Sequence, residues 1–203
     1  RGGRLHQRRV RRLGLIGCNL NELPETFGNL TKLTELDFGQ HSLSRLPESF
    51  GNLINLTSLN LKSNPLTVLP ESFGGLVSLE KLELRGTWLT RLPESFGNLS
   101  KIKRLEFGRL PFTMLPQSFG RLSGLTFLNL DHNPLTELPA SFGDLTALDS
   151  LILSYTQIRR LPESIGGLVN LSYLECKYTN LDSLSEAIGN LDNLKYLHLG
   201  NNQ

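Results

Sequence analysis

A repeat of 23 residues constrains the fold of this chain more than any other feature. The pair Leu-Pro recurs at that interval without insertion or deletion. Its leucines are Leu23, Leu46, Leu69, Leu92, Leu115, Leu138 and Leu161, and the next step reaches Leu184-Ser185. A fixed period of this length indicates a repeat architecture. One unit cannot bury its apolar face alone, so we expect the units to stack around a shared, quasi-one-dimensional core.

Apolar positions with the same period divide each unit into elements. The triplet Leu56, Leu59 and Leu61 ends in two apolar residues separated by one polar residue, which is the alternation of a short strand. The proline that follows excludes a regular strand, and Pro-Glu-Ser-Phe suits one turn of 3₁₀ or irregular helix. A phenylalanine column, softening to Ile165 and Ile188, is followed by a glycine in every unit. We expect these glycines to take positive φ and return the chain to the next strand.

These residues resemble the leucine-rich repeat in a 23-residue form. The unit that begins at Leu56 shows it well, with Leu-Thr-Ser-Leu-Asn-Leu-Lys-Ser-Asn-Pro-Leu followed by Leu69-Pro70 and Phe73-Gly74. The resemblance covers the chain from Val10 onward, and the units are similar to Roco-type, Scribble-type and plant intracellular Ras-group repeats.

The resemblance implies an α/β solenoid, a curved horseshoe segment of one domain over residues 1–203. Its parallel concave β-sheet would take one short strand from each coil, with 3₁₀ or irregular turns on the convex side. About eight to nine coils are expected, with residues 1–9 as a basic N-terminal arm or an incomplete coil.

One position after each strand departs from the family pattern. The family places Asn there, where its side chain bonds backbone groups of neighbouring coils, and this chain keeps it at Asn64, Asn133 and Asn202. Threonine or Cys18 stands there in other coils, and His41 and Leu110 are unusual. Because a leucine side chain cannot form a hydrogen bond, we expect a local irregularity or a bridging water at Leu110.

In the family, the residues beside the apolar strand positions are exposed on the concave face. Here they are charged and of mixed sign in the first half of the chain and aromatic in the second, and all four tyrosines fall on them. Tyrosine is enriched at binding interfaces. We therefore expect a partner-binding face; the alternative is cross-strand stacking that only stabilises the sheet. The candidate residues are Phe127, His132, Ile152, Tyr155, Tyr173, Tyr178, Tyr196 and His198, with Trp88, Arg104 and Arg109 as further candidates.

Charge is nearly balanced, with a formal net charge of +2, but it is unevenly distributed. Six arginines lie at the start of the chain, at Arg1, Arg4, Arg8, Arg9, Arg11 and Arg12; they form either a solvated end or a contact for nucleic acid or anionic lipid. Acidic residues follow most of the prolines, at Glu25, Glu48, Glu71, Glu94, Glu163 and Glu186. Free backbone amides at the start of a turn favour carboxylates. This column is either a solvated face or a surface for calcium or a basic peptide.

No pattern predicts catalysis, a metal or a cofactor. The four histidines lie in different units, and the chain has no Gly-rich phosphate loop, Ser-His-Asp arrangement or Cys-x-x-Cys pair. Cys18 and Cys176 are too far apart along the solenoid to pair, and we interpret both as small buried apolar residues. No apolar stretch is long enough to span a membrane. The isolated cysteines and the absence of a visible signal peptide favour a cytoplasmic location.

We therefore expect a protein-recognition module and interaction scaffold, as in signalling proteins, that is not an enzyme in its own right. The alternative is the recognition arm of a larger multidomain enzyme or signalling switch, such as a Roco-like GTPase or a ligase effector. Both ends favour this alternative, since the chain begins with Arg1 and closes on Asn202-Gln203, where the family would continue with leucine.

Overall fold

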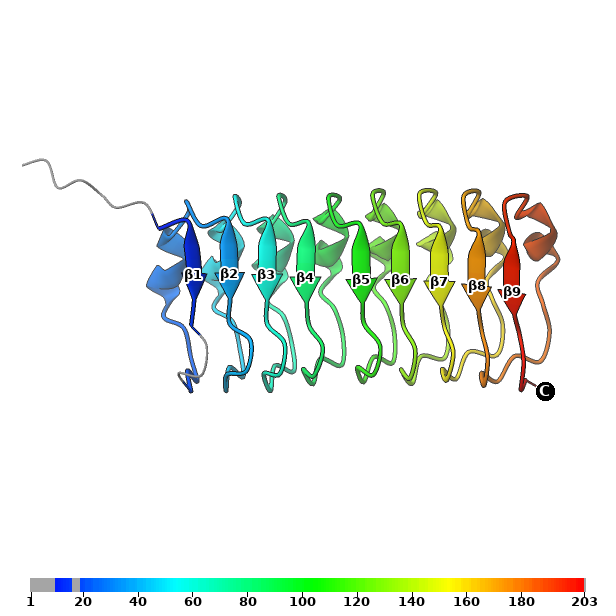
Figure 1. Ribbon diagram of the computed structural model, residues 1–203, viewed down its shortest axis with the longest axis horizontal. Coiled ribbons are helices and arrows are strands. Elements are labelled where there is room, and N and C mark those ends of the chain that lie inside the picture. Colours follow the sequence, from blue (N-terminus) through cyan, green and yellow to red (C-terminus); the bar gives the residue numbers. More distant parts are fainter. Residues whose placement is uncertain (1–9, 16–18, 203) are drawn as a thin grey trace, which may run out of the picture.

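The computed structural model describes residues 10–15 and 19–202 as a solenoid of stacked coils (Figure 1). Short strands lie side by side on one side, and 3₁₀ helices (η) lie on the other. The strands are β1 (Arg12–Gly14), β2 (Glu35–Asp37), β3 (Ser58–Asn60), β4 (Lys81–Glu83), β5 (Arg104–Glu106), β6 (Phe127–Asn129), β7 (Ser150–Ile152), β8 (Tyr173–Glu175) and β9 (Tyr196–His198). The helices are η1 (Glu25–Asn29), η2 (Glu48–Asn52), η3 (Glu71–Gly75), η4 (Glu94–Asn98), η5 (Gln117–Arg121), η6 (Ala140–Asp144), η7 (Glu163–Gly167) and η8 (Glu186–Asn190).

Except between β4 and β5, each strand pairs in parallel with the strand one repeat further on, so the repeat sets the register. Leu36 lies beside Leu59, and Leu59 lies beside Leu82. These central leucines are buried, while the residues on either side of them point away from the core. No helix among the described residues is long and apolar enough to cross a membrane.

Ring spacings show that the coils fan out toward the helix side. Successive rings of the phenylalanine column, from Phe27 to Phe142, stack with centroids 6.1 to 6.4 Å apart. At the edge of the strand face, the stacked rings of Tyr155 and Tyr178 are only 4.7 Å apart. Because the coils are closer together on the strand side, the solenoid curves with the strands on its concave face, as predicted.

The glycine after each phenylalanine allows two coils to pack closely. A Cβ atom added to Gly97 would lie 2.2 Å from the backbone oxygen of Ser118 in the next coil, and Gly74 has the same distance to Ser95. The prediction that these glycines take positive φ was wrong. Positive φ falls instead in the turns after strands β2 to β9, as at Gln40 and Ser63, because the chain reverses there.

The acidic column connects one coil to the next. The carboxylate of Glu25 accepts a hydrogen bond from the backbone amide of Ser49 at 3.1 Å. Glu94 accepts two, from the amides of Gln117 at 3.1 Å and Ser118 at 3.0 Å. The free amides that were expected to favour these carboxylates therefore belong to the first turn of the following 3₁₀ helix.

The concave sheet is divided into two, where the sequence predicted one. Strands β1 to β4 form the first sheet and β5 to β9 the second, and Figure 1 shows the wider gap between β4 and β5. Between other coils, a regular ladder of backbone hydrogen bonds joins adjacent strands. For example, the amides of Thr126 and Phe127 both donate to the backbone oxygen of Lys103. The amides of Lys103 and Arg104 have no such partner among the described residues of the preceding coil.

The residues after β5 explain why the sheet divides there. Asn133, which precedes a proline, donates from Nδ2 to the oxygen of Phe107 in the preceding coil at 2.8 Å. Where threonine replaces asparagine, the next residue has an amide that reaches back, as Trp88 does to the oxygen of Leu66 at 2.9 Å. The pair Leu110-Pro111 has neither the asparagine side chain nor a backbone N–H. The irregularity expected at Leu110 is thus an opening between two coils.

Candidate functional site

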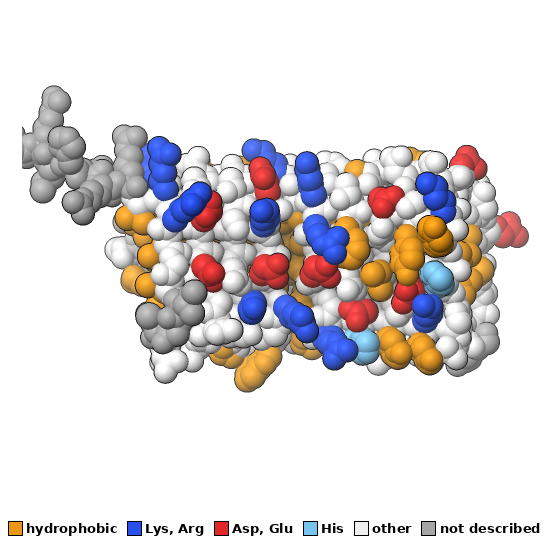
Figure 2. All heavy atoms as spheres, viewed as in Figure 1, with side chains coloured by type: hydrophobic (Ala, Val, Ile, Leu, Met, Phe, Trp, Pro, Cys, Tyr) orange, Lys and Arg blue, Asp and Glu red, His pale blue; other side chains and the backbone are white. Residues whose placement is uncertain are grey.

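Two rows of mostly aromatic side chains cover the strand face in the C-terminal half (Figure 2). The strand row projects from strands β6 to β9 and consists of Phe127, Ile152, Tyr173, Tyr196 and His198. The rim row lies in the turns that follow β6, β7 and β8 and consists of His132, Tyr155 and Tyr178. Charged side chains of both signs dominate the N-terminal half of the same face.

The rim row is a continuous stack of rings. His132 stacks on Tyr155 with ring centroids 4.3 Å apart, and Tyr155 stacks on Tyr178 at 4.7 Å. Both tyrosines are about half exposed. Because the rings cover one another's faces, their edges and hydroxyl groups are what the row presents to solvent.

All three residues of the rim row have a left-handed backbone. Their φ angles are 54° at His132, 58° at Tyr155 and 52° at Tyr178. This conformation costs a residue with a Cβ atom about 1 to 2 kcal/mol, and Gly or Asn takes it most readily. The chain therefore places large aromatic side chains where the backbone disfavours them.

Glu175, which the sequence reasoning did not single out, holds Tyr173 of the strand row. The Tyr173 hydroxyl donates to Glu175 Oε2 at 2.5 Å, and Ser154 Oγ donates to Oε1 at 2.8 Å. Lys177 Nζ lies 3.5 Å from the same carboxylate. The Tyr173 ring is also 6.1 Å from that of Tyr196. The available signal was an acidic residue two positions from both a tyrosine and a lysine, at Tyr173, Glu175 and Lys177.

This hydrogen bonding changes two pKa values. The hydrogen bond to Glu175 raises the pKa of Tyr173 to about 12, and partial burial and the charge of Glu175 add to it. Burial alone would raise the pKa of Glu175. The hydrogen bonds from Tyr173 and Ser154, together with the charge of Lys177, outweigh burial and lower that pKa.

We predict that Tyr173 ionises at a higher pH than an ordinary tyrosine. Its folded pKa of about 12 lies above the ordinary value of 10.0, so the folded state binds this proton more tightly than the unfolded chain does. The resulting stabilisation is complete below pH 10 and is lost as the pH rises through about 12. Titration of phenolate absorbance checks this: the original chain should show a transition near pH 12 that Tyr173→Phe lacks. A transition near pH 12 that persists in the variant would contradict the assignment.

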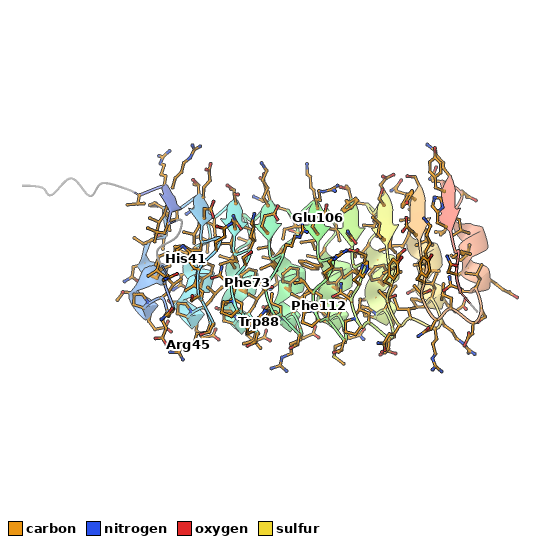
Figure 3. All side chains as sticks on the ribbon, turned by 60° about the horizontal axis from the view of Figure 1, so that its bottom comes forward. His41, Arg45, Phe73, Trp88, Glu106 and Phe112 are labelled. Carbon is orange, nitrogen blue, oxygen red and sulfur yellow. The ribbon has the colours of Figure 1, made fainter. Side chains whose placement is uncertain are left out.

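Two predicted residues border the rows, and Trp88 does not. The Arg104 guanidinium lies 3.5 Å from the centroid of the Phe127 ring and is 2.6 Å from Glu106. Arg109 lines a groove of about 430 Å³ whose other lining residues include Asp131, the neighbour of His132. Trp88 is exposed on the lower side of the solenoid in Figure 3, in the coil of β4, two coils before the coil in which the rim row begins at His132.

The remaining candidate residues give no chemical site. Arg1, Arg4, Arg8, Arg9 and Cys18 lie outside the described residues, so contact with nucleic acid or lipid stays a prediction. Cys176 is buried as expected, and that burial raises the pKa of its thiol to about 12. The part of the chain that the structure describes contains no group of three His, Cys, Asp or Glu residues that could hold a metal ion.

Comparison with known proteins places the chain in a family. The family described as a leucine-rich repeat region matches residues 3–84, 48–126 and 117–203. The chain therefore belongs to the leucine-rich-repeat family. A search of curated protein sequences finds no match.

Several solved structures are similar over most of the chain. A leucine-rich-repeat protein of Leptospira interrogans is 34% identical with a TM-score of 0.86, and the match covers 96% of this chain and 50% of that one. The plant peptide hormone receptor RGFR1 in complex with RGF2 is 29% identical with a TM-score of 0.77, over 90% of this chain and 31% of the receptor. The leucine-rich repeat domain of the type III effector XopL is 28% identical with a TM-score of 0.79, over 95% and 69%. The chain thus spans half the length of the Leptospira protein.

Proposed function

We propose that this chain binds a protein partner through the strand row and the rim row. The observation that carries the proposal is the rim row, in which bulky aromatic side chains are exposed and held in a disfavoured backbone conformation. The repeat itself sets the left-handed backbone at this position, as at Gln40 and Ser63, but it does not require an aromatic side chain there, and exposed aromatic groups on adjacent coils are typical of an interaction site. The structural neighbours support a role in binding, since one of them is a peptide hormone receptor in complex with RGF2.

Both rows are organised before a partner arrives, which reduces the entropy lost on binding. Stacking orders the rim rings, and the bonds to Glu175 order Tyr173. Pre-ordered aromatic groups make efficient interface anchors because few rotamers remain to be restricted.

A triple replacement tests the proposal. Tyr155, Tyr173 and Tyr178 changed together to Ala should lower the affinity for a purified partner by roughly a hundredfold or more. Thermal unfolding should change little, because these side chains lie outside the leucine and phenylalanine core. The partner would be captured on the immobilised chain, purified and titrated by calorimetry.

A matched variant in the charged half serves as the control. Lys62, Lys81 and Arg85 changed together to Ala remove three side chains from the same face but leave both aromatic rows intact. This variant should keep the affinity of the original chain. Unchanged binding by the tyrosine variant, or equal losses in the two variants, would overturn the proposal.

A second arrangement is that this binding face belongs to a larger enzyme or signalling switch, such as a Roco-like GTPase or a ligase effector. The similarity to a domain of a type III effector favours it. The sequence of the full-length gene tests it directly, since a catalytic domain in the same reading frame is the expected result. The cytoplasmic location stays a prediction.

A further inference from the structure

Trp88 is the centre of a second exposed apolar surface on the lower side of the middle coils (Figure 3). Its side chain is 63% exposed, and Met114 and Val68 in the two adjacent coils are 59% and 41% exposed. Pro65 and Pro111 occupy the position of Trp88 in those adjacent coils. Exposed apolar groups thus lie on three successive coils, with Arg91 at the repeat position between Val68 and Met114, and such groups are typical of an interaction site.

A groove of about 560 Å³ adjoins this surface. Its lining residue Arg91 lies three residues after Trp88 in the same coil. Val68 and Met114 line it, together with the prolines of four successive Leu-Pro pairs, Pro70, Pro93, Pro116 and Pro139. Its charged lining consists of four carboxylates and one guanidinium, from Glu48, Glu71, Glu94, Glu137 and Arg91. The groove is therefore apolar at its base and negatively charged overall.

The bonds between coils hold these carboxylates in place. Glu71 accepts a hydrogen bond from the amide of Ser95, and Glu94 accepts from the amides of Gln117 and Ser118. A carboxylate that accepts from neutral amides keeps its negative charge. The groove consequently presents fixed negative charge at Glu71 and Glu94, and the exposed Trp88 lies three residues before its lining residue Arg91.

We propose that this surface docks a protein segment that combines lysine or arginine side chains with a large apolar residue. The apolar residue would pack against Trp88 and Met114, and the basic side chains would lie along the glutamates, so that charge and polarity match on both sides. Trp88 supplies the type of anchor that dominates interface energies. Of the two ligands that the acidic column suggests, calcium and a basic peptide, the apolar neighbours favour the peptide.

Selection from a library of short random peptides displayed on phage tests the proposal on the whole chain. The enriched peptides should combine basic and apolar residues, and their affinity should fall as salt is added, because salt screens exposed charges. Changing Trp88→Gln should weaken their binding by about tenfold or more. Changing Glu71 and Glu94 together to Gln should weaken binding and reduce its salt dependence.

Both variants use residues that the chain already carries at the same repeat positions. Gln157 occupies the position of Trp88, and its amide donates to Leu135 just as that of Trp88 donates to Leu66. Gln117 occupies the position of Glu94. The fold therefore accepts glutamine at both positions, and lost binding would not reflect unfolding.

Val77→Gln is the matched control, since it removes an apolar side chain that is 48% exposed and lies outside the surface. This variant and the triple tyrosine variant should keep full peptide affinity, which separates this surface from the strand and rim rows. The proposal is overturned if no peptide is enriched, if the enriched peptides lack basic residues, or if Trp88→Gln binds them as well as the original chain does.

Discussion

Replacing Gly97 by alanine is expected to destabilise the protein by about 3 kcal/mol or more, a large effect for a single methyl group. The new Cβ atom would lie 2.2 Å from the backbone oxygen of Ser118 and 2.7 Å from its Cβ. Backbone cannot rotate away as a flexible side chain can, so η4 and η5 would have to separate. The stacking of Phe96 on Phe119 would then be disturbed, together with the hydrogen bonds that the Glu94 carboxylate accepts from the next coil. Urea unfolding followed by circular dichroism measures the loss.

The chain offers a graded control for this substitution. At Gly166 the nearest atom to an added Cβ, the oxygen of Ala187, is 3.0 Å away, and at Gly189 nothing lies within 4 Å. Alanine at Gly189 should be neutral or stabilise the helix slightly, because glycine is the more flexible residue. The loss at Gly166 should fall between the two. Equal losses at all three positions would show that the glycines matter for conformation and not for close packing.

Changing Asn133→Leu is expected to break the strand pairing between β5 and β6, as it is already broken between β4 and β5. The free energy of unfolding should fall by about 3 kcal/mol. The side chain is buried, donates to the oxygens of Phe107 and Leu130, and accepts from the amide of Phe112. Each buried polar group left without a partner costs about 1 to 3 kcal/mol. The proline that follows cannot supply an amide in its place, so the variant would reproduce the Leu110-Pro111 arrangement.

Hydrogen exchange distinguishes this opening from general instability. In the original chain, the amides of Lys103 and Arg104 should exchange faster than those of Thr126 and Phe127, which donate to the preceding coil. In Asn133→Leu, the amides of Thr126 and Phe127 should exchange faster than they do in the original chain. Conversely, Leu110→Asn should slow exchange at Lys103 and Arg104 by closing the existing gap between β4 and β5.

Thr156→Val is the control for the asparagine change. It removes one buried hydrogen bond, from Oγ1 to the oxygen of Leu153, but the amide of Gln157 still donates to Leu135. We expect a loss of about 1 kcal/mol and an intact sheet. An intact sheet in Asn133→Leu as well would contradict the explanation given for the gap between β4 and β5.

The period of the sequence by itself determined the architecture. Because the Leu-Pro interval never changes, it specifies which residues become neighbours in adjacent coils, and the parallel register follows from it. The alternation around Leu59 and Leu174 identified buried and exposed strand positions. It also placed the tyrosines on strand and turn positions that face away from the core, and Tyr155, Tyr178 and Tyr196 are exposed there while Tyr173 is partly buried.

Only the tertiary structure decided what happens between coils. The glycines prevent a clash with atoms one repeat away, and the glutamates bond amides one repeat away, neither of which a pattern within one unit can show. Likewise, Leu110 predicted an irregularity, but the loss of the whole ladder depends on Pro111 and on the preceding coil together. Periodicity specifies which positions are adjacent, whereas atomic contact determines whether adjacent positions bond, clash or separate.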